Sequence, residues 1–583
     1  MADLEALLSE RARSAMARAL GSAANGVDPA VRRSDRADYQ INAALGLAKV
    51  LRRPPREVAE SIAAQFEPDE ICERIEVSGP GFINLTVRDE YLAQLLSAEL
   101  LRVEAPMVAP SHQETVVIDY SAPNLSKEMH VGHLRSTILG DALARVLSWQ
   151  GHRVIAQNHI GDWGTPFGML IEHLIDLGEQ AAAQELSLRE LGQFYQQARV
   201  KFDSEPTFSE RSRQRVVLLQ NGDPKTTELW QLLVEKSKAY FSEIYRRLGV
   251  RLEEADIRGE SFYIPMLPAM AADLEAQGVA RIDAGALCIF LEGFIGRDGE
   301  PLPLMVRKKD GGFGYAATDL AAIRYRTEVL RADRLLYVMG ATQQQHLSMV
   351  FAAARKIGWL GESVRAEHVP FGSVLGLDKK MLKTRSGESV KLIDLLDEAE
   401  ERAERVVTQK NPNLDGEGRA RIARLVGIGA VKYADLSSDR IKDYVFDWDR
   451  MLALEGNTSP YLQYAHARIC SIFRKANLDP PKSDPDDTRA PVLLSKPEER
   501  ALALELVSFE PAVRLVCESL QPHRLAGYLY TLAGRFSAFY ETCAVLKAET
   551  EELYRSRLAL SGATALRLRK GLELLGIQAP ERM

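Results

Sequence analysis

The stretch TVVIDYSAPNLSKEMHVGHLRSTILGDALARVLSWQG, residues 115–151, decides the fold. It begins with a short apolar run typical of a buried strand, continues through a polar loop, and ends in a segment whose apolar residues recur at helical spacing. The next residues, HRVIAQ (152–157), again have the composition of a strand. Strand, loop, helix and strand make a βαβ unit, so we predict a Rossmann-type parallel sheet whose functional loop follows the first strand.

The regions before and inside this sheet have different patterns. With 583 residues the chain is too long for one hydrophobic core, and we predict an α/β multidomain protein. Residues 1–110 mix helical periodicity with two β-type runs in RIEVSGPGFINLTV (74–87), which predicts an N-terminal α+β domain. We assign residues 111–390 to the Rossmann-type domain, with a helical insertion at about 170–285.

After the insertion, three strand-like segments are expected to resume the parallel sheet: ALCIFLEG (286–293), RLLYVMG (334–340) and EHVPFGSVLG (367–376). Helical periodicity dominates the remainder of the chain. We predict a helical connecting region at residues 391–455 and an all-α C-terminal domain at residues 456–583.

Composition excludes several classes of protein. Hydrophobic residues make up 46% of the chain and charged residues 27%, which fits neither a disordered nor a fibrous protein. The five cysteines form no CxxC pair, so we expect no disulfide framework and no cysteine-rich zinc site. No apolar run is long enough for a bilayer, and the N-terminal MADLEALLSERARSAM is unlike a signal peptide. We therefore expect a cytoplasmic protein.

The motif HVGH, residues 130–133, stands at the start of the predicted helix. His130 and His133 could together hold a metal or merely cap the helix, yet no HExxH motif or cysteine accompanies them. Gly132 lets a flat or anionic ligand approach the backbone beside the helix N-terminus. Two imidazole donors at that place suit a phosphate that gains negative charge during a reaction, so we predict a phosphate site without a bound metal.

A cationic loop, DKKMLKTRSGESVKL (378–392), follows a predicted strand. Its cations are Lys379, Lys380, Lys383 and Arg385. Such a loop is either a solvated surface or the partner of the negatively charged phosphates expected at HVGH.

Together these motifs resemble signatures of the class I aminoacyl-tRNA synthetases. HVGH is similar to the HIGH signature and KMLKT (380–384) to the KMSKS signature, with Leu382 and Thr384 as departures. The surrounding sequence resembles that of the arginyl-tRNA synthetases over nearly the whole chain. It comprises SAPNLSKEMHVGHLRSTILGDALARVL and NHIGDWGTPFGML around HVGH, SGPGFINLTV near the N-terminus, SPYLQYAHARI at 459–469 and the closing APERM.

The resemblance implies an arginine:tRNA ligase that activates L-arginine with ATP to arginyl-adenylate. It then transfers the arginyl group to the 3′ end of tRNA(Arg), forming AMP and diphosphate. ATP with Mg²⁺ is implied as a substrate, and no protein-bound metal or organic cofactor is expected. The implied catalytic residues are His130, His133, Lys127 and Lys383, and the implied ATP-binding residues are Gly132 and Lys380. Lys127 resembles a lysine that supplements a degenerate KMSKS loop, so the division of labour among the three lysines stays open.

Arginine selection requires carboxylates, because a guanidinium is planar, permanently charged and rich in donors. In YAATD, Tyr315 and Asp319 are four residues apart and share a helical face. Both match positions at which the family binds the arginine side chain. Asp119 and Asn124 match positions near the α-amino end of the substrate, and Gln343 matches a further arginine contact.

The C-terminal domain resembles the family's anticodon-binding domain. Tyr464 and Arg468 are four residues apart, so an aromatic ring and a guanidinium could contact unpaired bases there, and the closing Met583 is a further tRNA candidate. The N-terminal domain resembles the module that contacts the tRNA elbow, with Asn84 or Tyr39 as possible contacts. We expect a monomer.

Two other functions were considered. A small-molecule nucleotidyltransferase also uses an HxGH loop, but it has no need of the long helical C-terminus. A catalytically silent tRNA-binding paralogue is disfavoured because both histidines and Lys383 are present.

Overall fold

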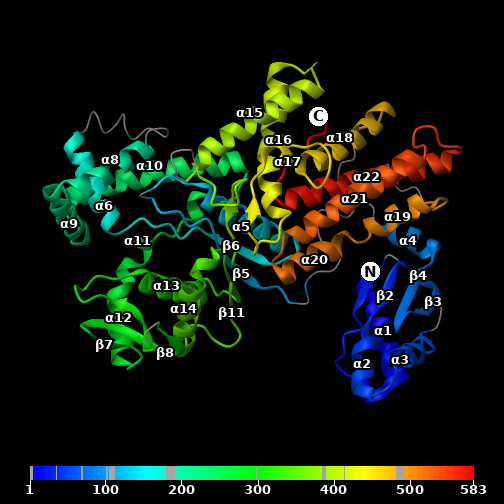
Figure 1. The fold of residues 1–583 in the computed structure, drawn as a ribbon, viewed down its shortest axis with the longest axis horizontal. Helices are drawn as coiled ribbons and strands as arrows, with labels where there is room; N and C mark the ends of the chain where they lie inside the picture. Colours follow the sequence, from blue (N-terminus) through cyan, green and yellow to red (C-terminus); the bar gives the residue numbers. More distant parts are fainter. Residues whose placement is uncertain are drawn as a thin grey trace.

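The computed structural model describes residues 4–34, 36–66, 70–99, 103, 110, 112–125, 127–178, 191–296, 299–383, 389–412, 414–480 and 491–583. Figure 1 shows the N-terminal domain at the lower right, the catalytic sheet in the centre and the C-terminal helices above both. The predicted class, an α/β multidomain protein with a helical C-terminus, is confirmed.

The N-terminal domain combines helices with an antiparallel sheet of order β1-β2-β4-β3. Its elements are α1 (Leu4–Leu20), η1 (Gly21–Ala24), β1 (Val31–Arg33), β2 (Tyr39–Ile41), α2 (Ala43–Leu51), α3 (Pro55–Ala63), β3 (Cys72–Ser78), β4 (Phe82–Val87) and α4 (Asp89–Glu99). The β3–β4 turn depends on Gly81, which has φ +146° and whose added Cβ would lie 2.8 Å from the Pro55 carbonyl oxygen. A side chain at that turn would therefore push α3 away from the sheet.

The central sheet is fully parallel, with the strand order β11-β10-β5-β6. Its strands are β5 (Thr115–Asp119), β6 (Arg153–Gln157), β10 (Arg334–Tyr337) and β11 (Arg365–His368), and α5 (Val131–Trp149) connects β5 to β6. The predicted βαβ unit is therefore confirmed. Because the chain leaves β5 in one direction and later returns to its other side, the β5–β10 junction is a topological switch point, where ligands of such sheets bind.

One of the three predicted continuations of this sheet is wrong, and EHVPFGSVLG is only partly right, because Glu367 and His368 end β11 whereas Val374 and Leu375 pair with residues 444–445 in a separate sheet. ALCIFLEG lies in β8 (Ala286–Ile295), which forms a separate antiparallel sheet of order β7-β8-β9 with β7 (Arg281–Asp283) and β9 (Pro301–Arg307). An apolar run indicates that a strand is buried but does not specify its partner. Helices α12 (Leu267–Ala276), α13 (Tyr315–Arg324) and α14 (Gln344–Ile357) share a second hydrophobic core with this sheet.

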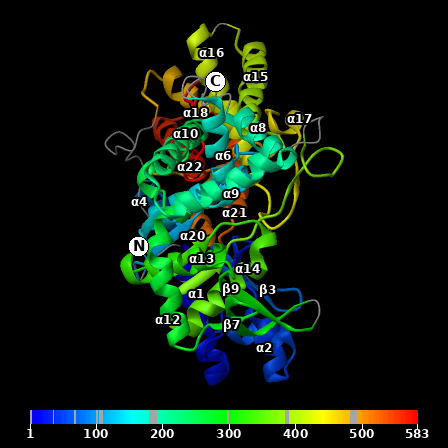
Figure 2. The same ribbon diagram turned by 90° about the vertical axis from the view of Figure 1, so that its left-hand side faces the viewer.

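The insertion is helical as predicted. It contains α6 (Thr165–Leu177), α8 (Leu191–Ser204), α9 (Pro206–Gln220) and α10 (Pro224–Leu248), followed by the short turns η2 (Glu254–Asp256), α11 (Glu260–Tyr263) and η3 (Ile264–Met266). Figure 2 shows these helices in front of the C-terminal ones. Leu233, Phe241 and Leu248 lie on the buried face of α10, in agreement with the helical spacing of the sequence.

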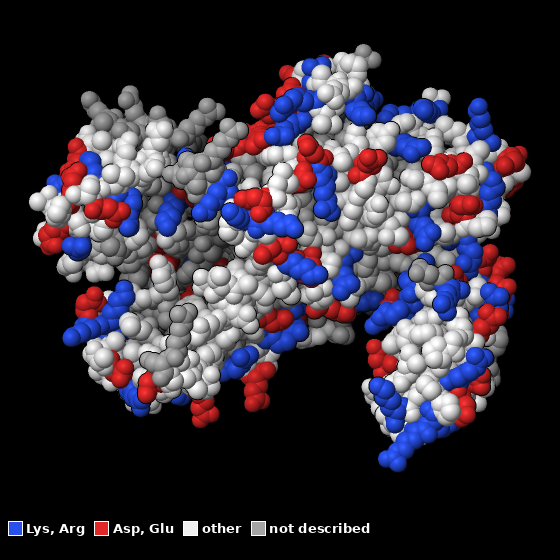
Figure 3. Space-filling model, viewed as in Figure 1, with Lys and Arg blue, Asp and Glu red and all other residues white. Residues whose placement is uncertain are grey.

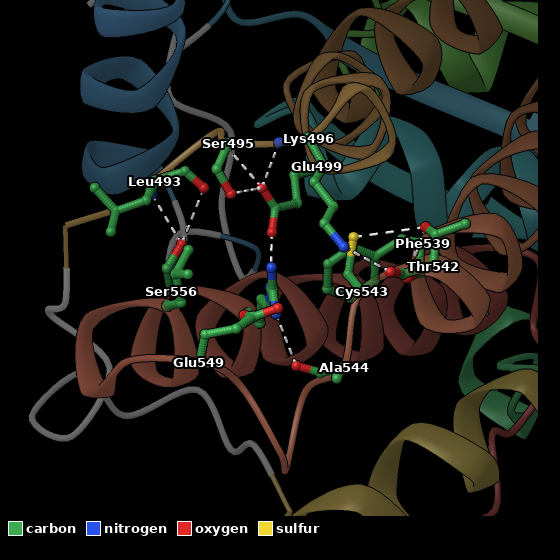
Figure 4. Close-up of polar contacts among 12 residues, drawn as sticks. Leu493, Ser495, Lys496, Glu499, Phe539, Thr542, Cys543, Ala544, Glu549 and Ser556 are labelled. Atoms are coloured by element: carbon green, nitrogen blue, oxygen red, sulfur yellow. Dashed lines mark hydrogen bonds and ion pairs between the residues drawn. The ribbon is translucent and has the colours of Figure 1, made fainter.

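The C-terminal part is built from α15 (Leu392–Lys410), α16 (Gly416–Leu436), α17 (Trp448–Met451), α18 (Ser459–Lys475), α19 (Pro497–Leu506), α20 (Phe509–Ser519), α21 (His523–Thr542) and α22 (Glu551–Leu574). Two short strands, β12 (Val374–Leu375) and β13 (Tyr444–Val445), pair in parallel beneath it. Figure 4 shows how α19 begins: the Glu499 carboxylate accepts hydrogen bonds from the backbone of Ser495 and Lys496. Its other oxygen accepts from the buried Arg557 on α22, so one carboxylate caps a helix and ties two helices together.

The five cysteines are all described, and each is buried and free. Among the described residues, no helix is both long and apolar enough to cross a membrane.

Candidate active site

The loop after β5 carries the first group of site residues. Ser121 and Ala122 both adopt positive φ, at 71° and 44°, which costs a non-glycine residue about 1–3 kcal/mol. Asn124 follows, and its side chain lies against Gly161, where an added Cβ would be 3.1 Å from the Asn124 amide nitrogen. This loop therefore holds a strained conformation directly at the topological switch point.

The two histidines of HVGH cap α5 with their own rings. The Gly132 N–H donates to Nδ1 of His130 at 3.0 Å, and the His130 N–H donates to Nδ1 of His133 at 3.1 Å. The ring centroids are 4.1 Å apart. In both rings Nδ1 is thus an acceptor, which places the proton on Nε2 and leaves two Nε2–H donors at the helix N-terminus. The two interpretations of HVGH, as a helix cap and as a phosphate site, are therefore compatible.

The electrostatics keep both rings neutral. Burial, with a smaller contribution from Lys127, lowers the pKa of His130. Burial and the neighbouring His130 lower the pKa of His133 to about 3. Near neutral pH each imidazole therefore offers a single Nε2–H without a cationic charge, and Lys127 supplies positive charge close by.

The KMLKT loop returns to the same place. Leu375 pairs with Met381 across a tight turn, and Lys383 pairs with Ser389 farther along. The next residues then run beside HVGH, because the Val131 N–H donates to the Val390 carbonyl at 3.0 Å. Backbone pairing thus brings the cationic loop to the N-terminus of α5.

The cations of this site are solvent-accessible. Lys127, Lys379, Lys380 and Lys383 are all exposed. Thr384 and Arg385, which the sequence reading placed in the same loop, lie outside the described residues. Gly132 is exposed as well, and a Cβ there would lie 2.8 Å from Cε1 of His130, so a side chain at this position would displace the histidine ring.

A second cluster lies on α13 and α11. Asp319 accepts a 2.6 Å hydrogen bond from Nε2 of His346, and its side chain is 17% exposed. Tyr315, one turn earlier on α13, is 69% exposed. Burial raises the pKa of Glu260 to about 8, with added repulsion from Asp162 and Asp319, and burial together with the smaller effect of Glu260 raises the pKa of Tyr315. Two carboxylates and a phenol thus face one another at a place that favours a cation.

Asp119, which ends β5, lies in a different environment from Asp319. It is 2% exposed, and its Oδ2 accepts a 2.8 Å hydrogen bond from Arg326. Arg326 comes from the π-helical turn η4 (Tyr325–Val329), and it also donates to Gln157 at the end of β6. The second oxygen of Asp119 has no hydrogen-bond partner among the described residues. The structure thus joins the strand ends through Arg326 and leaves one oxygen of Asp119 unused.

Gln343 ends the turn η5 (Ala341–Gln343) and is exposed, three residues before His346. It lies in the segment between β10 and α14, the helix that carries His346. Among the described residues, no group of three or more His, Cys, Asp or Glu side chains is arranged to hold a metal ion.

Comparison with known families agrees with this geometry. A model described as "tRNA synthetases class I (R), catalytic domain" matches residues 95–448, which is more than half of the chain. The chain belongs to the arginyl-tRNA synthetases. Models of the arginyl-tRNA synthetase N-terminal domain and of the DALR anticodon-binding domain match residues 5–87 and 462–583.

Relatives of this arginyl-tRNA synthetase match along their full length. An arginine–tRNA ligase of Thermobifida fusca is 54% identical over 583 residues, and one of Escherichia coli K12 is 47% identical over 584, each with 100% of both chains covered. The crystal structure of the Plasmodium falciparum arginyl-tRNA synthetase superposes with a TM-score of 0.83 at 30% identity, covering both chains fully. The Thermus thermophilus arginyl-tRNA synthetase gives 0.80 at 27% identity, again over both full chains. The protein is an arginine–tRNA ligase, with arginine, ATP and tRNA(Arg) as its substrates.

The expected tRNA contacts of this arginyl-tRNA synthetase are placed on α18 and at the chain end. Tyr464 is 47% exposed, whereas the Arg468 guanidinium lies 4.5 Å from the ring centre of Tyr540. The carbonyl of Met583 accepts from the Asn411 side chain at 3.4 Å. Tyr39 is 2% exposed in the N-terminal sheet, with the Arg33 guanidinium 5.2 Å from its ring centre, whereas Asn84 is half-buried.

Sequence reasoning missed three side chains of this arginyl-tRNA synthetase that the fold brings to the site. They are Glu260, His346 and Arg326. His346 is the last residue of YVMGATQQQH (337–346), where its spacing of three residues from Gln343 was a visible signal. Glu260 and Arg326 carry no local signal, because each is recruited by contacts far away along the chain.

Proposed function

We propose that His130 and His133 stabilise the transition state of arginine activation. The arginine carboxylate oxygen attacks the α-phosphorus of ATP, which is used as its Mg²⁺ complex, and the bond to the bridging oxygen of the β-phosphate breaks. Diphosphate leaves with that electron pair, and arginyl-adenylate is formed. The observation that carries the proposal is that backbone N–H groups occupy both Nδ1 atoms, so that two neutral Nε2–H donors remain at the helix N-terminus.

The lysines and Gly132 complete the ATP site. Lys383 and Lys380, on the hairpin that returns to HVGH, hold the departing diphosphate, while Lys127 adds charge beside the histidines. Gly132 admits the flat adenine beside the backbone. In the second step the ribose hydroxyl at the 3′ end of tRNA attacks the arginyl carbonyl carbon, and AMP leaves.

Arginine selection is assigned to the cluster on α13 and α11. Asp319 pairs with the substrate guanidinium, and Tyr315 and Gln343 add hydrogen bonds from two sides. Glu260 supports this assignment, since a carboxyl whose pKa is raised to about 8 in the absence of a partner gains from an arriving cation. Asn124 and the unused oxygen of Asp119 bind the α-amino end at the strand ends.

The anticodon bases are assigned to Tyr464 and Arg468 in the domain 456–583, with Met583 at its edge. Arg468 is pre-oriented by Tyr540, which supports a stacking role. The elbow contact is assigned to the domain 1–110, whose lower tip in Figure 3 carries basic side chains; Lys49, Arg52 and Arg53 on and after α2 are exposed. The catalytic domain at 111–390 and the connecting region at 391–455 complete the assignment. We further propose a monomer with no resident metal or organic cofactor, and a cytoplasmic location, which suits five free and buried thiols.

The test compares two variants of His133 with a control variant at His112. His133→Ala removes one preorganised donor and is expected to lower kcat of arginine activation by ~10²–10³ with little change in the KM of arginine. His133→Gln retains an N–H donor near the Nε2 position, so its kcat should fall less. His112→Ala, at an exposed position before β5, serves as the control. An unchanged kcat in His133→Ala would refute the proposed role.

A further inference from the structure

The loop between β5 and α5 is held from outside the sheet. Ser121 and Ala122 are two successive non-glycine residues with positive φ, a conformation that L residues leave unless other contacts fix it. The loop lies immediately before Asn124, to which the α-amino end of arginine is assigned above. Whatever fixes Ser121 and Ala122 therefore fixes the position of Asn124.

A buried hydrogen-bond network fixes them. The Ala122 N–H donates to Oδ1 of Asn158 at 3.0 Å, and Nδ2 of Asn158 donates to the Tyr245 hydroxyl at 3.0 Å. The same hydroxyl lies 2.7 Å from Oγ of Ser121. The Tyr245 oxygen thus contacts Ser121 directly and Ala122 through the Asn158 amide.

Tyr245 does not belong to the sheet or to its connecting helix. It comes from α10, the last long helix of the insertion, 124 residues along the chain from Ser121. Ser121, Asn158 and Tyr245 are 4%, 0% and 4% exposed, so water has no free access to replace a missing hydroxyl.

We propose that the Tyr245 hydroxyl is a positioning group for arginine activation, by which the helical insertion holds the strained loop so that Asn124 faces the substrate. The proposal rests on the assigned role of Asn124. Ser136 contributes from the other side, because its Oγ accepts from the Ser121 N–H at 2.9 Å, but this contact belongs to α5 and remains when Tyr245 is altered.

The test uses Tyr245→Phe, which removes a single oxygen. The matched control is Tyr240→Phe on the same helix: Tyr240 is 1% exposed, and its hydroxyl has no partner among the described residues. We expect Tyr245→Phe to lower kcat/KM for arginine roughly ten- to hundred-fold, the scale of a misplaced substrate contact, with the KM of ATP unchanged. Tyr240→Phe should remain near wild type. Equal effects of the two substitutions would overturn the proposal.

A rescue variant separates positioning from a general loss of packing. In the Tyr245→Phe background, Ala122→Gly lets the backbone adopt positive φ without strain and should restore much of the lost kcat/KM. In the wild-type background the same change should have little effect. A Tyr245→Phe enzyme that is impaired but not rescued by Ala122→Gly would contradict the mechanism.

Asn124→Ala, measured in parallel, tests the assigned role of Asn124 separately from the positioning role of Tyr245. If Asn124→Ala leaves arginine use intact, the assigned role of Asn124 fails. If Asn124→Ala is impaired while Tyr245→Phe behaves like Tyr240→Phe, only the positioning role of Tyr245 fails.

Discussion

Single residues in the α13 cluster explain how a pocket for a cation remains stable while it is empty. Asp319 accepts a hydrogen bond from His346. Glu260 is largely protonated near neutral pH because burial raises its pKa to about 8. The pocket thus avoids two unpaired carboxylates in a partly desolvated place. An arriving guanidinium displaces protons from both groups, so that binding and proton release are coupled.

Removing the charge of Asp319 should weaken arginine use strongly. Asp319→Asn keeps the shape but leaves the guanidinium without its anionic partner, which costs about 3–5 kcal/mol for a buried pair. We expect kcat/KM for arginine to fall on the order of a hundred- to a few-thousand-fold, with ATP binding retained. The affinity for neutral citrulline, measured with citrulline as a competitor, should fall much less. Near wild-type charging with arginine would show that Asp319 does not bind the guanidinium.

The same cluster predicts a pH dependence. The hydrogen bond to Asp319 raises the pKa of His346 above its ordinary 6.5, so the imidazolium that neutralises Asp319 persists to higher pH. As the pH rises through this pKa and that of Glu260, about 8, both partners release their protons and the KM of arginine should fall. His346→Gln retains an N–H donor without titrating and should remove the contribution of His346 to the change. A KM that is flat across this range in the wild type would contradict the coupling.

At the scale of elements, the local sequence pattern sufficed to predict the βαβ unit of β5, α5 and β6, but not the sheet to which β8 belongs. The period of apolar residues is a property of neighbouring residues, and HVGH marks its own helix start by capping it with two imidazoles. Strand β8 has an equally clear apolar run, yet its partners β7 and β9 are chosen by tertiary packing. For the same reason the motifs pointed to His130 and His133, while Glu260 and Tyr245 became visible only once distant helices were placed.

The exposed ring on α18 belongs to this scale as well. If Tyr464 stacks on an anticodon base, Tyr464→Ala should cost about 1–3 kcal/mol per base and raise the KM of tRNA accordingly. The KM of arginine should not change. Tyr464→Phe keeps the stacking face and should behave like the wild type in the same aminoacylation assay. Equal protection of the anticodon in footprints of the wild type and Tyr464→Ala would place the contact elsewhere.

At the scale of the whole molecule, two buried or half-buried cations join the domains. Lys432 on α16 donates to the carbonyls of Leu248 and Gly576, the ends of α10 and α22, at 2.8 and 2.6 Å. Arg500 on α19 reaches the N-terminal domain, where it binds both oxygens of Asp38 at 2.7 Å and one of Asp89 at 2.6 Å. Figure 1 shows α19 beside α4 at this junction. The Arg500 contacts therefore join the two domains that are assigned to tRNA contact.

Arg500→Lys tests this junction. A lysine cannot reproduce the forked contact with Asp38 while also reaching Asp89, so the loss of charged hydrogen bonds should cost about 1.5–3 kcal/mol at the interface. Hydrogen–deuterium exchange of the β4 and α4 amides should become faster. Arg56→Lys, which alters an exposed ion pair with Glu60 on α3, is the control and should change nothing measurable. Unchanged exchange in Arg500→Lys would show that other contacts hold the domain.

The five buried cysteines have a practical consequence for measuring the distance between these domains with dyes. Burial raises the pKa of Cys72 and Cys470 to about 11 and that of Cys517 to about 12, so reactive thiolate is scarce at neutral pH. A cysteine introduced at Val50, which is 73% exposed, would therefore react with a maleimide dye far ahead of the native thiols. With a second dye at Leu515 on α20, which is 43% exposed, energy transfer would report the distance between the N-terminal and C-terminal domains without prior replacement of the native cysteines.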